Sequence, residues 1–196
     1  GDNTLALALR QVANLSAGKV LTGGSLALAV PVLKNNGLLQ VGGDLTLTGD
    51  SLDNSGDISA RTLTLHHSGA QTHNAGAKLQ AQLEAVLSAA TLTNNGSVQG
   101  KALSVHEGRI TNNGTLTNHA SNQLDNYGTL NNNAGQQLNN YGTLNNHTGA
   151  TLMNTGGMLS NYHTLHNSGT LTNNGSLSNA NDLQASPGSG LFNTGT

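Results

Sequence analysis

Several residue types that build ordinary protein cores and reactive sites are scarce in this chain of 196 residues. It has no cysteine, no tryptophan, one phenylalanine and two prolines, and aromatic residues make up 2% of it. The absence of cysteine excludes disulfide bonds, thiolate metal sites and thiol nucleophiles. Large aromatic side chains anchor most globular cores, so their scarcity argues against a conventional globular domain.

Charge is equally scarce, at 8% of the residues. Seven lysines and arginines stand against nine acidic residues, and all seven lie at or before Arg109. Binding to nucleic acid through phosphates needs many more cations, so we expect no nucleic-acid partner. After Arg109 only Asp125 and Asp182 carry charge, so amides and hydroxyls must keep that half in solution.

Two targeting features are also missing from the sequence. No apolar run approaches the roughly 20 residues that a membrane-spanning helix needs. The first residues do not resemble a signal peptide, so we expect either a mature chain or an excised fragment.

The chain is instead dominated by repetition. One marker is an apolar–x–Asn–x–Gly motif, and a second is an alternating apolar pair that begins at Leu26, Leu45, Leu63, Leu83 and Leu103. Because both markers recur with one period of about 20 residues, they indicate a repeat architecture. The motif asparagines, which we expect to form one column, are Asn35, Asn54, Asn74, Asn94 and Asn112.

The rhythm tightens after residue 110, where asparagine recurs mostly at gaps of six or eight. If each gap is one side of a coil, three sides give a coil of about 20 residues, as in the first half. Two sides would give a shorter, flattened coil. A left-handed hexapeptide helix is an alternative for the last hexads, from Leu165. We favour the three-sided coil because it continues the first half without a change of cross-section. The chain is thus divided into a regular region, 1–109, and an Asn/Gly-rich region, 110–196.

Helices resist such a density of glycine and asparagine, whereas period-two alternation broken by these residues is typical of short strands joined by turns. We therefore predict an all-β fold, a parallel β-helix (β-solenoid) with about 20 residues and three short strands per coil. Gln82–Ala90 looks locally helical, but we expect strand there because Leu83 falls on the strand register. About ten coils would give a rod on the order of 45–50 Å long.

One run resembles a known repeat: Asp44–Leu65, with the sequence DLTLTGDSLDNSGDISARTLTL. It is similar to the haemagglutinin repeat of filamentous haemagglutinins, the large exoproteins of bacterial two-partner secretion. That family includes adhesins, haemolysins and contact-dependent growth inhibition effectors, and the resemblance covers roughly residues 20–116. It implies a right-handed parallel β-helix, secretion through an outer-membrane transporter and a place on the bacterial cell surface. It does not identify a receptor.

The polar residues do not predict a chemical site. Carboxylates are too sparse for an acid–base pair, and no serine lies in a Gly-x-Ser-x-Gly motif, so we expect no enzyme, no catalytic residue and no cofactor. His66 or His67 could cluster with His73 across a corner, and so could His163 with His166. With so few carboxylates nearby, we expect no metal site and solvated histidines instead. Asp44, Asp50, Asp53 and Asp57 could form an acidic edge on neighbouring corners, but we favour solvated corner residues there.

The candidate surface contacts are the tyrosines Tyr127, Tyr141 and Tyr162. Tyr127 and Tyr141 occupy the same motif position, between Asn and Gly, and repeat duplication alone would account for this. Exposed tyrosines beside amides also suit contact with a glycan or a protein. Ice binding is less favoured because the Thr-x-Thr pairs have uneven spacing.

These features predict a non-enzymatic rod or stalk segment of a secreted, cell-surface bacterial exoprotein that serves adhesion or contact-dependent toxin delivery. The alternative is a module that binds a glycan or a receptor on a host or neighbouring cell through the uncharged face of 110–196. Neither end looks capped, so we expect a piece of a longer solenoid that can self-associate through its ends.

Overall fold

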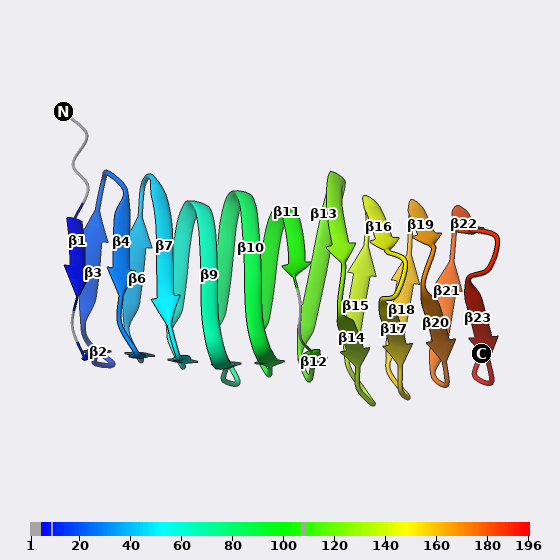
Figure 1. Ribbon diagram of the computed structural model, residues 1–196, viewed down its shortest axis with the longest axis horizontal. Helices are drawn as coiled ribbons and strands as arrows, with labels where there is room; N and C mark the ends of the chain where they lie inside the picture. The colour runs from blue at the N-terminus through cyan, green and yellow to red at the C-terminus, as the bar shows by residue number, and fades with distance from the viewer. Residues whose placement is uncertain (1–4, 9, 107–108) are drawn as a thin grey trace.

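The chain winds into a three-sided β-solenoid (Figure 1). This computed structural model describes residues 5–8, 10–106 and 109–196, and side-chain surroundings are described for 10–99, 111–118 and 123–196. Among these residues there are 23 strands and no helix, and the strands pair in parallel as one sheet of about nine turns. The described chain therefore contains no apolar helix long enough to cross a membrane.

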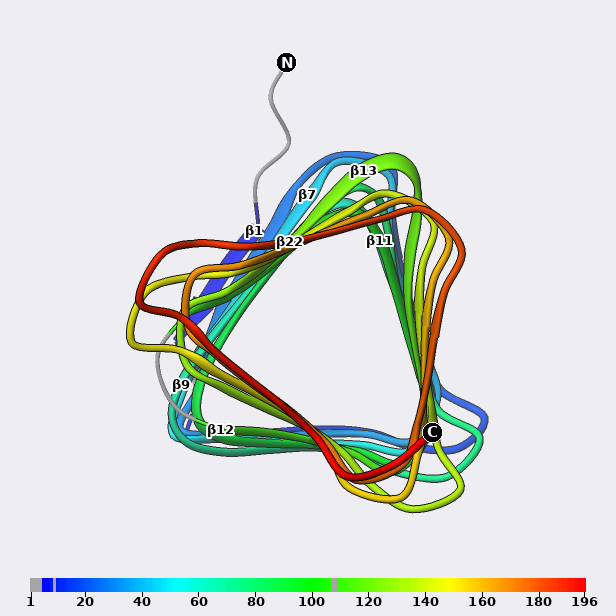
Figure 2. The same ribbon diagram turned by 90° about the vertical axis from the view of Figure 1, so that its right-hand side faces the viewer.

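The cross-section is triangular, and the solenoid is right-handed, as the family resemblance implied (Figure 2). Seen from the C-terminal coil, the chain runs counter-clockwise as it advances towards the viewer. We number the faces 1, 2 and 3 in the order in which the chain visits them, and we name each corner by the two faces that it joins.

Face 1 contains the middle or end of the long strands as well as six short ones. Its short strands are β1 (Leu5–Ala8), β4 (Leu26–Ala29), β7 (Asp44–Gly49), β16 (Thr143–Asn146), β19 (Thr164–Asn167) and β22 (Asp182–Ala185). The long strands turn corners without a break, and they are β9 (Asp57–His73), β10 (Lys78–Asn94), β11 (Ser97–His106) and β13 (Thr115–Asn126).

Face 2 contains the ends of β9 and β10. Its other strands are β2 (Gln11–Asn14), β5 (Val32–Asn35), β8 (Ser51–Asn54), β12 (Arg109–Asn112), β14 (Thr129–Asn132), β17 (Thr151–Asn154), β20 (Thr170–Asn173) and β23 (Gly190–Asn193). Face 3 contains the starts of β9, β10, β11 and β13. Its short strands are β3 (Lys19–Thr22), β6 (Leu38–Val41), β15 (Gln137–Asn140), β18 (Met158–Asn161) and β21 (Ser176–Asn179).

The core is a set of aliphatic columns inside the triangle. On face 1, for example, Leu45 pairs in register with Leu63, and both are fully buried. Alternate residues of each strand point inwards, which explains the alternating burial in strands such as β14 and β16. Buried aliphatic side chains pack on their counterparts in adjacent coils, and one hydrophobic cluster runs through the rod from Leu26 to Leu171.

The coils of the second half have three sides, as the favoured interpretation of the spacing requires. Residues in register lie 20 apart at Asn112 and Asn132, 22 apart at Asn132 and Asn154, and 19 apart at Asn154 and Asn173. The flattened two-sided coil and the hexapeptide helix are therefore not what this region forms. The six- and eight-residue gaps are the individual sides of one triangular coil.

The strand register expected at Leu83 is wrong, although the segment is indeed strand. Ala85 pairs with Leu63 and Leu87 pairs with Leu65, so this coil is longer than the preceding one, in which Leu63 pairs with Leu45. The ladder is irregular between Ala81 and Glu84, and the extra residue places Leu83 at a corner, where it is 42% exposed.

Glycine is needed at corner 2–3 because adjacent coils approach each other there. A Cβ atom on Gly114 would lie 2.2 Å from the carbonyl oxygen of Gly96, and one on Gly175 would lie 2.3 Å from that of Gly157. Side chains larger than hydrogen therefore do not fit without movement of the backbone. This close approach explains the glycine of the Asn–x–Gly motif.

Candidate functional site

The most extensive polar feature of the rod is an interior column of asparagines at corner 2–3. Where asparagine follows asparagine in this column, the side-chain amide donates to the amide oxygen of its counterpart in the next coil, as from Asn112 Nδ2 to Asn132 Oδ1 at 2.8 Å. Its second hydrogen goes to a backbone carbonyl, here that of Gln137 at 2.9 Å. Both N–H bonds of the buried amide are thereby satisfied, which explains how so polar a side chain is tolerated inside the rod.

Four of the five asparagines expected in this column lie in it. Asn35 donates to Asn54 at 2.8 Å, and Asn94 donates to Asn112 at 2.9 Å. The column begins at Asn14 among the described side chains and continues to Asn193.

The expectation for Asn74 is wrong, because His73 takes the position in the column. His73 pairs in register with Asn54 and Asn94, whereas Asn74 lies outside and donates to Asp53 Oδ1 at 2.7 Å. The cause is a longer corner. Gly76 adopts a positive φ of 83° in a turn closed by the Ala77 amide and the Asn74 carbonyl, so the motif glycine is displaced from the close-packed position.

Two more asparagine columns begin where the sequence rhythm tightens. At corner 3–1 the column contains Asn118, Asn140, Asn161 and Asn179. At corner 1–2 it contains Asn126, Asn146 and Asn167. On face 1 of the first half the same inward position is aliphatic, as at Leu47 and Leu65. The two sequence regions thus differ in whether one corner or all three are lined by amides.

The tyrosines lie outside these columns, at two different corners. Tyr141 and Tyr162 follow the asparagines of corner 3–1, and their rings stack at 4.6 Å with an angle of 4° between them. Tyr127 lies at corner 1–2, where it stacks on His147 at 4.0 Å. The three tyrosines are 41–47% exposed. Tyr127 and Tyr141 therefore share a motif position but not a corner, and the two stacks border face 1 on opposite sides.

One carboxylate lies between these stacks on the outer side of face 1. Asp125 accepts hydrogen bonds from Gln123, from Asn145 at 2.8 Å and from His147 Nε2 at 2.9 Å. Burial alone would raise the pKa of Asp125, but these hydrogen bonds and the nearby imidazole outweigh it and hold that pKa below its ordinary value. The only signal for this cluster in the sequence is the scarcity of charge after Arg109.

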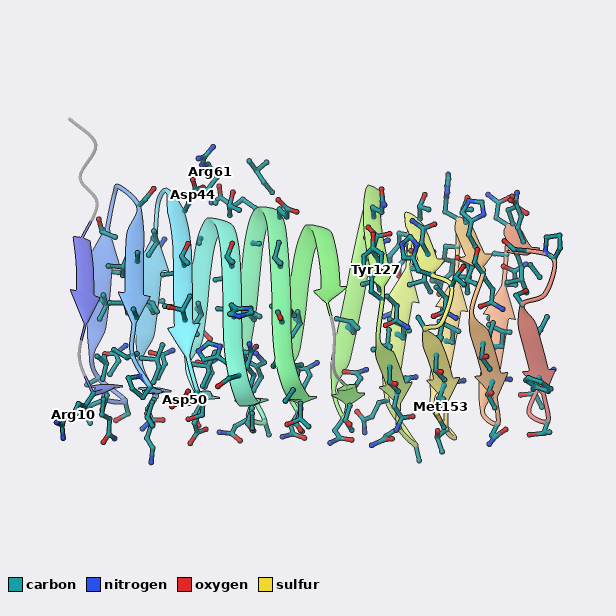
Figure 3. All side chains as sticks on the ribbon, in the orientation of Figure 1. Arg10, Asp44, Asp50, Arg61, Tyr127 and Met153 are labelled. Carbon is teal, nitrogen blue, oxygen red and sulfur yellow. The ribbon has the colours of Figure 1, made fainter. Side chains whose placement is uncertain are left out.

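The other aspartates do not gather at one edge. Asp44 pairs with Arg61 at 2.9 Å, and Asp50 lies at the opposite edge of the rod, where it accepts from Ser68 Oγ (Figure 3). Among the residues that the structure describes, no group of three histidines and carboxylates is arranged to hold a metal ion.

Two of the expected surface histidines are instead buried. His67 is 2% exposed and His73 is fully buried, and both face the interior of the rod. The expectation of solvated histidines is wrong at these two positions, because the corner residues between His66 and His73 turn alternate side chains inwards. The sequence contained a signal for this burial: His67, Gln71 and His73 are separated by even numbers of residues, so they point to the same side of β9, which is the inner one.

The Thr-x-Thr pairs fall on different faces. Thr46 and Thr64 share a column on face 1, whereas Thr91 and Thr93 lie on face 2 and Thr115 and Thr117 lie on face 3. They therefore do not build one flat threonine array over the described chain.

Two shallow hollows of about 500 and 470 Å³ follow corner 2–3 and adjoin at Gly135, Gln136 and Gln137.

Together these features define a class of protein: a β-solenoid rod segment with a hydrogen-bonded interior and a nearly uncharged outer face in its second half. Comparison with known proteins finds two relatives that are similar to part of the chain. The chain is 37% identical over 115 residues to "Toxin CdiA" of Escherichia coli, an alignment that covers 50% of the chain and 4% of the relative. It is 33% identical over 124 residues to "tRNA nuclease CdiA" of Escherichia coli strain NC101, which covers 56% of the chain and 4% of the relative.

These similarities and the β-solenoid confirm the resemblance to two-partner secretion exoproteins. The chain spans about one twenty-fifth of the length of either relative, so the toxin and nuclease activities in their names are stated of those proteins. No family model matches the chain, and no solved structure matches it.

Proposed function

We propose that this chain is a rod segment of a cell-surface exoprotein related to CdiA, and that it serves as a spacer in contact-dependent delivery of a toxin. The observation that carries the proposal is the unbroken stack of coils in a segment similar to two CdiA proteins. A spacer needs a constant cross-section and a rigid axis. Continuous leucine and asparagine columns supply both, because each coil is held by its two neighbours.

Secretion through an outer-membrane transporter and a place on the bacterial surface belong to this proposal. Residues 110–196 have two charges, so the mature rod depends on amides and hydroxyls for solvation. The rod would not itself perform the toxic reaction. Its chemistry is confined to hydrogen bonds that fix the stacking of coils.

The proposal is tested by deletions in the parent exoprotein. Removal of 133–154 takes out one whole coil and keeps the strand register, because Asn132 and Asn154 are counterparts in adjacent coils. We expect a rod shorter by about 4.8 Å that still folds, is secreted and delivers its toxin. The matched control removes 133–143, which is half a coil and brings unlike faces into register. Loss of delivery by the whole-coil deletion, in a protein that is secreted and folded, would contradict a spacer.

A second function is favoured by the aromatic stacks beside face 1. We propose that the outer surface of β13, β16 and β19 contacts a glycan or a receptor on a neighbouring cell. Aromatic rings beside amides and one carboxylate provide both apolar contact and hydrogen bonds. However, Tyr141 and Tyr162 cover one ring face of each other, so a ligand can contact only the edges and the outer face of each ring.

A glycan array and a cell-binding assay separate the two functions. In the contact model, Tyr127→Ala and Tyr162→Ala weaken binding at least tenfold while the rod stays folded. The matched control is Thr172→Ala, on the outer side of face 2, which should leave binding unchanged. Unaltered binding of both tyrosine variants would leave the spacer as the function of this segment.

A further inference from the structure

One coil of the rod carries three buried polar side chains at inward positions where the adjacent coils have aliphatic residues, glycine or asparagine. His67, Gln71 and His73 all belong to β9 and are all buried. In the adjacent coils the counterparts of Gln71 are Leu52 and Leu92. His67 likewise pairs in register with Gly49 and Ala89, and His73 replaces an asparagine of the corner 2–3 column.

The hydrogen bonds of this cluster are incomplete. Gln71 Nε2 lies 2.9 Å from His67 Nδ1 and donates to the Ser88 carbonyl at 3.0 Å, and Asn54 Nδ2 lies 3.3 Å from His73 Nδ1. Within the described part of the chain, His67 Nε2, Gln71 Oε1 and His73 Nε2 have no hydrogen-bond partner. At Asn112 and Asn132, by contrast, every buried side-chain nitrogen and oxygen has a hydrogen-bond partner. The coil of His67, Gln71 and His73 is therefore less completely hydrogen-bonded than the regular asparagine column.

Little charge surrounds the cluster to stabilise a protonated imidazole. The side chains that β8 and β10 turn towards it are uncharged, namely Leu52, Asn54, Leu92 and Asn94. The titratable groups that act on His67 are His66, which opposes its protonation, and Asp50, which favours it. The titratable group that acts on His73 is His67, which opposes its protonation. Protonation of both buried rings would therefore place two like charges in an apolar interior with one carboxylate nearby.

We propose that the coil around His67, Gln71 and His73 is an acid-sensitive joint, which opens locally in mildly acidic solution while the coils on either side stay wound. Its opening exposes the two imidazoles to water, where they can take up protons. The joint is independent of the role of the rod at the cell surface, since it follows from the interior of one coil.

The direction of the pH response follows from linkage. Burial is the main cause that lowers the pKa of His67 and of His73 from 6.5 to about 4. Above pH 6.5 both states are neutral, and between pH 6.5 and 4 only the opened state binds protons, so stability is lost as the pH falls. Between pH 7 and pH 5 the opening constant should rise about 20-fold for each histidine that titrates in this way.

Hydrogen–deuterium exchange of the whole chain at pH 7 and pH 5, corrected for the intrinsic exchange rates, measures this opening. We expect amides within 57–94 to lose at least about 20-fold in protection between pH 7 and pH 5, whereas those within 137–167 keep theirs. An equal loss of protection along the whole rod would overturn the proposal.

A variant that restores the neighbouring residues tests the cause. His67→Ala, Gln71→Leu and His73→Asn together give this coil the side chains of its neighbours and should abolish the difference between pH 7 and pH 5. His166→Asn, on the outer side of face 1, is the control and should keep the acid response. If the triple variant fails to fold at pH 7 by circular dichroism, His73→Asn alone should still reduce the response. An acid response that persists in folded variants without the buried histidines would refute the joint.

Discussion

At the scale of single residues, an interior asparagine is stabilised because both of its side-chain N–H groups find acceptors in the adjacent coil. Asn140 is fully buried, accepts from Asn118 and donates both to Asn161 and to the Thr164 carbonyl. Its neighbour Asn139 points outwards on the same strand. Identical side chains thus have different roles that strand alternation alone assigns.

Replacement of Asn140 by alanine should lower the free energy of unfolding by about 1–3 kcal/mol, because Asn118 and Asn161 lose a buried partner. Asn139→Ala is the matched control and should change it by less than about 0.5 kcal/mol. Denaturant unfolding of both variants measures the difference. Equal effects would mean that the column adds no stability beyond that of surface amides.

Asp125, like the buried histidines, should make the unfolding free energy fall as the pH falls, but at lower pH and because its charged form is the one stabilised in the fold. Its pKa is held below the ordinary value, so its stabilisation is present above pH 3.8 and is lost as the pH falls through the lowered pKa. Asp125→Asn should therefore be destabilising at pH 7, and the difference from the parent chain should shrink at pH 2. A constant difference between these pH values would show that the carboxylate charge is not what Gln123, Asn145 and His147 recognise.

At the scale of strands and corners, repeat spacing predicts the elements well where coils have equal lengths. The period alone places Asn35, Asn54, Asn94 and Asn112 correctly in one column, because the corners after them are short. It misplaces Asn74 because that corner contains an additional turn, and Leu83 because its coil is longer than the coils on either side. A fixed period has no means of locating inserted residues, since Gly76 in a turn looks the same as a glycine of the close-packed corner.

The close-packed corner itself can be tested at Gly114. A methyl group there meets the Gly96 carbonyl oxygen at 2.2 Å, so Gly114→Ala should cost about 1–3 kcal/mol in unfolding free energy. Gly23 provides the control, since a Cβ atom there has no neighbour within 4 Å among the described residues. Gly23→Ala should be neutral in the same thermal and denaturant measurements. Tolerance of both substitutions would imply that the corner can move apart at little cost.

At the scale of the whole molecule, the rod is a one-dimensional assembly in which coils stabilise only their neighbours. The sequence predicted this architecture and the continuity of its two regions. It did not predict the interior cluster of β9 or the stacked rings, because both depend on which residues of adjacent coils come into register. Periodicity gives the number of residues per coil, but contacts between coils depend on the exact corner lengths.

Leu138→Asp tests this nearest-neighbour character. Leu138 is fully buried between Leu116 and Leu159, so a carboxylate there would lie unpaired in the aliphatic column and cost more than about 4 kcal/mol. Hydrogen exchange should show loss of protection in the coils that contain Leu116 and Leu159 and little change near Leu45. Leu83→Asp, at an exposed corner, is the control. An unchanged melting temperature for Leu138→Asp would place that side chain outside the core.

The orientation of the asparagine amides gives the rod an electrical direction. In all three columns, wherever one asparagine stacks on another, Nδ2 donates to the coil that follows, as from Asn126 to Asn146 and from Asn140 to Asn161. Side-chain dipoles therefore add along the axis, as peptide dipoles do in a helix, with the positive end towards the C-terminal coil. Beyond Asn112 three such dipoles add per turn instead of one. The second half should therefore be the more strongly polarised part of the rod, and any further coil can continue its amide columns in a single orientation.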